Sequence, residues 1–204
     1  MFNYEKVKVE LVPLTAEGRE RFILDNQEAF RYGAMEEFGM RDNSFEEDGE
    51  IISRETIERS IDGENAEAYR IVLPGDSSGN GVCEENQRQE VGGVVIRLEP
   101  ERKFGDLELL FVSPKVHSKG IGYAAWKAIE DLHPEVEVWE TVTPYFETRN
   151  IHFYVNRCGF HIVEFFNSHH PDPNDPDMSG DVGAESGHFG MRDGMFRFQK
   201  VMDQ

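Results

Sequence analysis

A glycine-containing segment from Val116 to Ala125 has the residue types needed to bind an anionic phosphate group. Gly120 and Gly122 stand at i and i+2 between an apolar stretch and a helix-like stretch. Glycines at this spacing let the backbone turn tightly and direct several N–H groups at one point. The N-terminus of the following helix adds positive partial charge. The segment predicts a pyrophosphate-binding loop made of His117, Ser118, Lys119, Gly120, Ile121, Gly122 and Tyr123.

The charge around this loop agrees with an anion site. Residues 115–127 contain three lysines and no acidic residue, although the chain has 40 acidic and 21 basic residues. Two other interpretations compete: an ordinary strand-to-helix turn and a dinucleotide-binding loop. The dinucleotide fingerprint needs a third glycine and follows the first strand of its fold. Here Ala125 stands at the third position and the loop follows a late strand.

A second segment, from Asn150 to Phe160, carries an amide and a phenol at helical spacing. Asn150 and Tyr154 stand at i and i+4, so they would share one face of a helix. Gly159 is placed to end that helix. A phenol hydroxyl is a proton donor at neutral pH. The alternative for Tyr154 is a purely structural core aromatic.

Together these two segments resemble the GNAT acetyltransferase superfamily, and the resemblance runs from about Lys6 to Met202. The stretch from Leu109 to Pro114, followed by Gly120-Ile121-Gly122, resembles the central strand and acetyl-CoA loop of that family. The segment from Asn150 to Phe160 resembles its later motif of Asn, Tyr and Gly-Phe. The two motifs occur in the family's order, joined by a predicted helix and strand.

The resemblance implies an α/β fold with a mixed, mostly antiparallel seven-stranded sheet and flanking helices. Its two central parallel strands would splay apart. The pantetheine arm of acetyl-CoA would lie in the gap, bonded to the open strand edge at Leu110, Phe111 and Val112. The family usually places Gln or Arg where this chain has His117. Because main-chain N–H groups do most of the phosphate holding, we expect coenzyme binding to persist.

The implied activity is transfer of an acetyl group from acetyl-CoA to a primary amine of a small molecule or peptide, by direct attack. Asn150 would hold pantetheine, and Tyr154 would protonate the departing thiolate. Backbone N–H groups near Leu110 would polarise the thioester carbonyl. No covalent enzyme intermediate is needed, and we expect Cys158 to be packed rather than nucleophilic. The alternative is a non-catalytic acyl-CoA-binding or sensing module on the same scaffold.

The acceptor amine must lose a proton, and the strand that precedes the loop offers two carboxylates. Glu108 is the preferred base, directly or through water, because an acid in an otherwise apolar strand is unusual. Asp106 would face the same way two residues earlier and is its rival. A salt bridge at the strand end is the structural alternative for both.

The acceptor pocket is expected between the first two helices, where the family often shapes its substrate site. Tyr32, Glu36 and Glu37 lie in the segment Arg31–Phe38 that we place there. Tyr145 would join them from the later half of the chain.

The elements that must position these residues follow from the pattern of apolar side chains. Alternation and apolar runs predict strands at Lys6–Val12, Tyr69–Leu73, Val91–Leu98, Leu107–Val112, Val136–Val142, Phe160–Phe166 and Phe196–Val201. Helices are predicted after a Thr15 cap, after a Ser53 cap, at Ile121–Leu132 and at Arg149–Arg157. Gly33 and Gly39 would flank a looser region. The strand–helix–strand order around Ile121–Leu132 implies one parallel pair.

Length and composition limit the remaining possibilities. The 204 residues indicate one domain spanning 1–204, with an acidic, Pro- and Gly-rich insertion at 169–194 before the last strand. The net charge of −19 disfavours nucleic acids and anionic lipid. It favours a cationic partner, and the alternative is that it serves solubility alone. Two cysteines without ligand spacing predict neither a metal nor a disulfide, and no long apolar run is present, so a cytoplasmic protein is expected. A final edge strand and the late insertion would support a homodimer.

Overall fold

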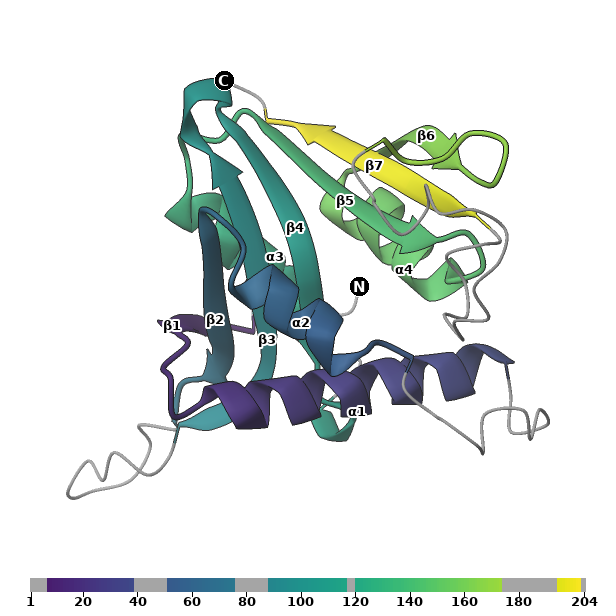
Figure 1. Ribbon diagram of the computed structural model, residues 1–204. Helices are drawn as coiled ribbons and strands as arrows, with labels where there is room; N and C mark the ends of the chain where they lie inside the picture. The colour runs from purple at the N-terminus through teal and green to yellow at the C-terminus, as the bar shows by residue number, and fades with distance from the viewer. Residues whose placement is uncertain (1–6, 39–50, 76–87, 117–119, 174–193, 203–204) are drawn as a thin grey trace, which may run out of the picture.

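A computed structural model describes residues 7–38, 51–75, 88–116, 120–173 and 194–202 of the chain. Its strands form one seven-stranded sheet in the order β1-β2-β3-β4-β5-β7-β6 (Figure 1). The strands are β1 (Glu10–Pro13), β2 (Ala66–Leu73), β3 (Gln89–Glu99), β4 (Phe104–Val112), β5 (Val138–Pro144), β6 (His161–Phe166) and β7 (Met195–Val201). The helices are α1 (Arg19–Phe38), α2 (Arg54–Ile61), α3 (Ile121–Leu132) and α4 (Thr148–His152), which continues as a π-helical turn at Phe153–Cys158.

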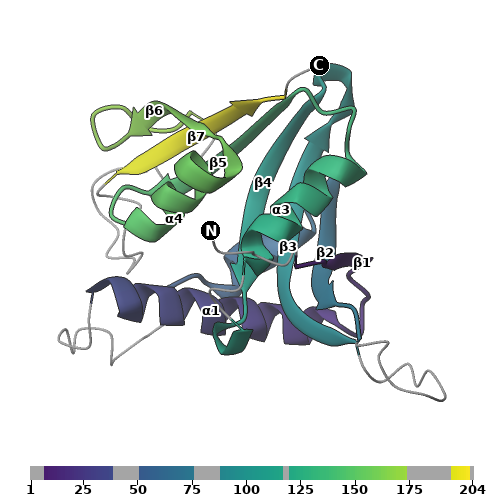
Figure 2. The ribbon, with the colours of Figure 1, turned by 180° about the vertical axis from the view of Figure 1, so that it is seen from behind.

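Helices cover both faces of this sheet. Helices α1 and α2 lie on one face (Figure 1), and α3 and α4 lie on the other (Figure 2). Phe22 of α1 and Ile57 of α2 are fully buried against Phe111 on the first face. On the second face, Trp126 of α3 is fully buried against Trp139 of β5. Each such large apolar side chain contributes on the order of 2 kcal/mol to folding, so the helices fix the sheet from both sides.

The two central strands are parallel and separate along their length, as expected. The ladder between β4 and β5 holds only from Phe104↔Val138 to Asp106↔Glu140, and every other strand pair is antiparallel. At the point of separation, Thr141 Oγ1 donates a hydrogen bond of 2.9 Å to the carbonyl oxygen of Leu107. Beyond this point, the β4 backbone facing β5 has no strand partner in the described residues.

A β-bulge at Glu108 accompanies the separation of the two strands. Val95 of β3 pairs with Leu109, whereas Ile96 pairs with Leu107, so Glu108 is an extra residue in β4. The bulge turns Leu107 to the α3 side of the sheet and Leu109 to the α1 side, where each joins a different core. Bulges re-aim side chains and are frequent beside active sites.

Several local predictions from the sequence are confirmed. Helix α3 has the bounds expected, Ile121–Leu132. Helix α2 begins as expected, with the Ser53 side chain accepting a hydrogen bond of 3.1 Å from the backbone N–H of Thr56. These features depend on short-range patterns, which a sequence displays directly.

The expectation of a looser region beginning at Gly33 is wrong. Helix α1 continues through Gly33 to Phe38, so the segment Arg31–Phe38 is helical rather than a connection between two helices. A glycine inside a helix costs only about 1 kcal/mol. The buried side chains earlier in α1, Phe22 and Ile23, supply more than that.

The last strand is not at the edge of the sheet, which corrects a second expectation. β7 pairs with β5 on one side and with β6 on the other, so β6 is the edge strand of this half. Phe198 of β7 is fully buried, which explains its central position. Because both edges of β7 are paired, β7 cannot serve as the edge strand through which two copies would associate.

Candidate functional site

The predicted phosphate loop leads into helix α3 as its sequence suggested. Gly120 is the N-cap of α3, with a left-handed backbone at φ +78°, and it brings no capping side chain. The first N–H groups of the helix are therefore not capped by that residue, and the helix dipole makes them suitable for an anion. His117, Ser118 and Lys119 lie outside the described residues.

The two sequence motifs meet in space. A Cβ added to Gly122, in the first turn of α3, would lie 3.5 Å from the Phe153 ring in the π-helical turn. The guanidinium carbon of Arg157 lies 5.7 Å from the centre of the Tyr123 ring. The start of α3 and the helix that carries Asn150 and Tyr154 are therefore neighbours in the structure.

We expect substitution of Gly120 by alanine to lower the free energy of unfolding by about 1 kcal/mol, because a left-handed backbone penalises a Cβ. The matched control is Gly33→Ala, since Gly33 lies within α1 and has open space around it. That change should raise stability by about 0.5–1 kcal/mol. Urea unfolding of both variants measures the difference, and a Gly120→Ala protein as stable as Gly33→Ala would contradict this description of the loop.

The edge of β4 that was predicted to bind pantetheine lies beside this loop. Leu110 and Val112 are half-buried and pack against Ile121 and Ala125 of α3. Phe111 points to the other face, where its ring centre lies 5.1 Å from that of Phe22. These side chains fix the strand from both faces and leave its backbone edge turned toward β5.

Tyr154 combines a core position with a polar contact at the strand separation. Its side chain is 8% exposed, and its ring packs edge-on against Phe160 at 5.7 Å. Its phenol hydrogen-bonds with the hydroxyl of Thr141, which itself donates to the Leu107 carbonyl. Burial raises the pKa of Tyr154 to about 12, so the phenol keeps its proton at neutral pH.

Asn150 and Tyr154 share a helix face, as the i, i+4 spacing predicted. Asn150 Nδ2 lies 3.5 Å from Thr143 Oγ1, and Tyr154 contacts Thr141, two residues earlier on the same strand face. Between them the helix widens into a π-helical turn, which ends at Gly159 with φ +81°. Such turns hold one additional residue and are frequent at functional sites.

The two predicted carboxylates lie on the face covered by α2. Arg97 Nη2 donates to Asp106 Oδ2 at 2.7 Å, and Arg97 Nη1 lies 3.1 Å from Glu108 Oε1. The Ser60 hydroxyl of α2 donates to Glu108 Oε2 at 3.4 Å. Burial raises the pKa of both carboxyl groups above the ordinary values, and the Arg97 charge opposes this rise. The structure therefore places both acids in the same cluster beside the bulge.

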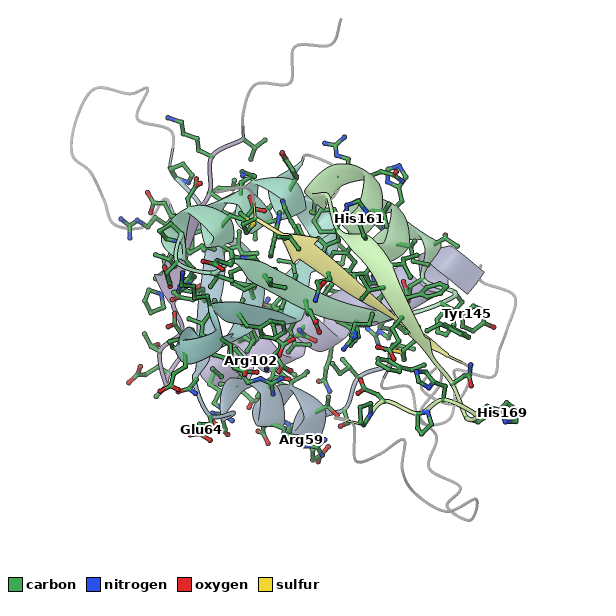
Figure 3. All side chains as sticks on the ribbon, turned by 90° about the horizontal axis from the view of Figure 1, so that it is seen from above. Arg59, Glu64, Arg102, Tyr145, His161 and His169 are labelled. Atoms are coloured by element: carbon green, nitrogen blue, oxygen red, sulfur yellow. The ribbon has the colours of Figure 1, made fainter. Side chains whose placement is uncertain are left out.

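The predicted acceptor residues are spread over two elements. Tyr32 lies in α1, with its side chain 38% exposed, and the side chains of Glu36 and Glu37 lie outside the described residues. Tyr145 follows β5 and packs edge-on against Phe146. Figure 3 shows Tyr145 at the rim of the sheet, away from the end that carries Arg102.

Sequence reasoning missed Arg97, Ser60, Thr141 and Thr143. The pairing Arg97↔Asp106 follows from the β3–β4 hairpin, whose turn contains Pro100 and ends with Lys103 in a left-handed conformation. Counting outward from that turn would have found Arg97. Ser60 comes from an element distant in sequence, whereas the two threonines lie on β5, the strand directly before α4. No local pattern marks any of the three.

Cys158 is packed, as expected. Its side chain is 2% exposed and lies in the core beneath α3. Burial raises the pKa of its thiol to about 12, so the thiolate that a nucleophile requires is scarce at neutral pH.

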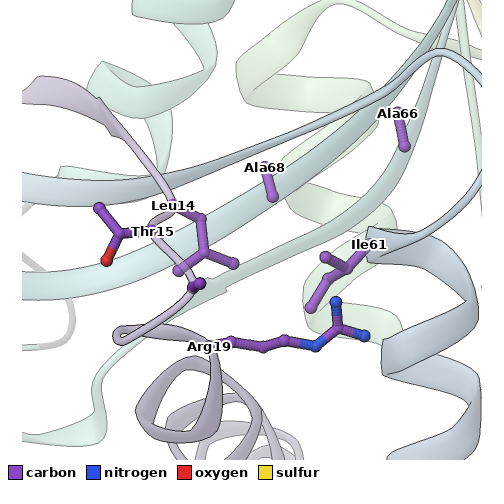
Figure 4. A pocket seen from close by; sticks show the side chains of 7 residues that line it. Leu14, Thr15, Arg19, Ile61, Ala66 and Ala68 are labelled. Carbon is purple, nitrogen blue, oxygen red and sulfur yellow. The ribbon is translucent and has the colours of Figure 1, made fainter.

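A cavity of about 280 Å³ lies apart from the cluster of Arg97, Asp106 and Glu108 (Figure 4). It is formed by the turn before α1, the end of α2 and β2, with Leu14, Ile61 and Ala68 in its wall. Arg19 also lines it and forms two hydrogen bonds of 2.6 Å with Asp62. None of the residues predicted to bind coenzyme or acceptor lines this cavity.

Among the described residues, no group of three or more His, Cys, Asp or Glu side chains is arranged to hold a metal ion. Within the same ranges, no helix combines the length and apolarity needed to cross a membrane.

Known proteins resemble this chain in sequence and in fold. A relative from Bacillus subtilis (strain 168), the uncharacterized protein YrkN, is 42% identical over 176 residues, which cover 86% of this chain and 84% of the relative. The ribosomal-protein-S18-alanine N-acetyltransferase from Escherichia coli has a TM-score of 0.58 at 11% identity, covering 96% of this chain and 95% of the other. The spermidine N-acetyltransferase from Vibrio cholerae, in complex with CoA and spermine, has a TM-score of 0.58 at 12% identity and 95% coverage of both chains.

At these identities the two solved structures show a shared fold. The sequence model of the Acetyltransferase (GNAT) family matches residues 42–160, more than half of the 204 residues, and includes the phosphate loop and Tyr154. The chain belongs to the acetyltransferase (GNAT) family.

Proposed function

We propose that this protein transfers the acetyl group of acetyl-CoA to a primary amine of a small molecule or peptide. The observation that carries this proposal is the separation of β4 and β5 after Asp106 and Glu140. Tyr154 contacts Thr141 of β5 at this point, and Glu108 lies in β4 two residues after Asp106. An open strand edge suits the peptide-like pantetheine arm. A phenol and a carboxylate at that point suit the two proton transfers of aminolysis.

Acetyl-CoA is bound, in this proposal, along a line from α3 to β4. The N–H groups from Gly120 to Tyr123, with His117, Ser118 and Lys119, hold the diphosphate. The backbone of Leu110, Phe111 and Val112 holds pantetheine, together with Asn150. The left-handed Gly120 and the unpaired β4 edge fit such a ligand. The spermidine N-acetyltransferase from Vibrio cholerae, in complex with CoA and spermine, has the same fold.

The proposed reaction is a direct attack. The neutral amine nitrogen forms a bond to the thioester carbon, while N–H groups near Leu110 stabilise charge on the carbonyl oxygen. Glu108, or its rival Asp106, takes the proton that the amine loses. The carbon–sulfur bond breaks, and Tyr154 gives its proton to the sulfur. The raised pKa of Tyr154, about 12, keeps that proton available.

The acceptor is a cationic amine in this proposal. A net charge of −19 attracts cations over distances up to about a Debye length. Tyr32, Glu36, Glu37 and Tyr145 remain the proposed contacts. The protein is proposed to act in the cytoplasm, and its association into a homodimer stays a prediction.

The test is thiol release from acetyl-CoA with a panel of polyamines, amino sugars, amino acids and peptides. We expect acetyl-CoA alone to raise the melting temperature, because a ligand that binds only the folded state stabilises it. We expect at least one amine to give turnover above hydrolysis. A melting shift without turnover on any amine would favour an acyl-CoA-binding module, and no shift would argue against coenzyme binding altogether.

A further inference from the structure

We propose that Arg97 is a positioning residue for the acetyl transfer: anchored on Asp106, it orients the Glu108 carboxylate and keeps it ionised. This inference rests on the proposed function, because it assigns Glu108 rather than Asp106 as the base. Arg97 itself touches neither reactant in this account.

The geometry follows from the hairpin and the alternation of β4. Arg97 and Asp106 are direct cross-strand partners, and their side chains form a hydrogen bond of 2.7 Å. Glu108 stands two residues after Asp106, so strand alternation places it on the same α2 face, and the bulge changes the side of Leu109 instead. Glu108 is within reach of the same guanidinium at 3.1 Å and of Ser60. One planar guanidinium therefore joins both acids, which a lysine ammonium does less well.

The two carboxylates have unequal bonds to Arg97. Asp106 makes the shorter, hydrogen-bonded contact, so it is the group held in place. Glu108 has a longer contact to Arg97, and the second oxygen of its carboxylate has only the 3.4 Å bond to Ser60. A base must have an oxygen that can accept a new proton. Each acid keeps one oxygen that Arg97 does not contact, so the assignment rests on how firmly Arg97 holds the other. Asp106, bound at 2.7 Å, is the anchor, and Glu108, held at 3.1 Å, is the base.

The charges near Glu108 make Arg97 necessary. Burial and the neighbouring Asp106 raise the pKa of Glu108, while Arg97 and the Ser60 hydroxyl lower it. Glu99 raises the pKa of Asp106 and Arg102 lowers it. Glu140 is the cross-strand partner of Asp106 on β5. Among the described residues whose charge shifts the pKa of Glu108, Arg97 supplies the positive charge. Its removal should leave the glutamate protonated over a wider range of pH.

Arg97→Gln, Arg97→Lys and Arg102→Gln test this inference. Arg102 is a matched control, because it lies on the same hairpin and pairs with Glu99 at 2.8 Å rather than with Glu108. The first readout needs no amine: the pKa of Glu108 by carbon NMR of glutamate-labelled protein, assigned by the signal that Glu108→Gln loses. We expect Arg97→Gln to raise that pKa by about 1 unit or more, with Arg97→Lys between it and the wild type and Arg102→Gln unchanged.

The second readout is the pH profile of kcat/KM with an active amine. Because the base works ionised, a higher pKa moves the acidic limb to higher pH, and Arg97→Gln should show the same shift as the NMR titration. An unchanged Glu108 pKa, or an active Arg97→Gln enzyme with an unmoved acidic limb, would overturn the inference. If the wild type acetylates no amine, the proposed function fails, and the NMR titration still decides whether Arg97 controls Glu108.

Discussion

The Tyr154→Phe enzyme is expected to have kcat lowered by about 100-fold or more, with KM for acetyl-CoA nearly unchanged. General acid catalysis contributes factors of this size. The phenylalanine keeps the ring contacts with Phe160 and Phe198 and removes only the hydroxyl that meets Thr141 at the strand separation. Steady-state kinetics measure the split between kcat and KM.

The control for this variant is Tyr69→Phe. Tyr69 is a partly buried tyrosine, and its phenol donates to Glu67 on the same strand, away from the β4–β5 separation. It should reduce stability by about 1 kcal/mol, the net worth of a hydrogen bond, with little effect on kcat. Equal kcat values for Tyr154→Phe and the wild type would remove Tyr154 from the mechanism.

For Glu108→Gln, we expect kcat/KM at neutral pH to fall by about 100-fold or more, since the amide cannot accept the proton of the amine. The wild type should lose activity as pH falls through the raised pKa of Glu108, because protonation removes the base. The variant should lack that limb. Its remaining activity should rise with pH as more of the amine becomes neutral in solution.

Asp106→Asn is the companion to Glu108→Gln. Asparagine keeps an oxygen that accepts from Arg97, so the anchor weakens without disappearing, and the loss of kcat/KM should be several-fold smaller than for Glu108→Gln. The reverse order of the two losses would identify Asp106 as the base.

The local structure of the candidate coenzyme segments could be predicted from sequence, for a physical reason. The turn at Gly120, the helix Ile121–Leu132 and the left-handed end at Gly159 are set by residues close in the chain. The parallel pair followed from one strand–helix–strand crossover. Local backbone preferences and short-range periodicity carry this information.

The features that the sequence did not predict depend on contacts between distant segments. The residues of Met195–Val201 do not indicate locally that this strand inserts between β5 and β6, where Phe198 is buried. Gly33 suggests a break in the helix, yet packing elsewhere along α1 keeps this position helical. The cluster in which Arg97 and Ser60 meet the Glu108 carboxylate depends on the register of two strands and the position of a third element.

The most direct measurement is a crystal structure of the protein with acetyl-CoA. The account predicts the diphosphate on the N–H groups from Gly120 to Tyr123 and the pantetheine amides paired with the β4 backbone at Leu110 to Val112. The thioester should lie between Tyr154 and Glu108. A coenzyme bound elsewhere, or a loop and strand edge left empty at saturating acetyl-CoA, would contradict it.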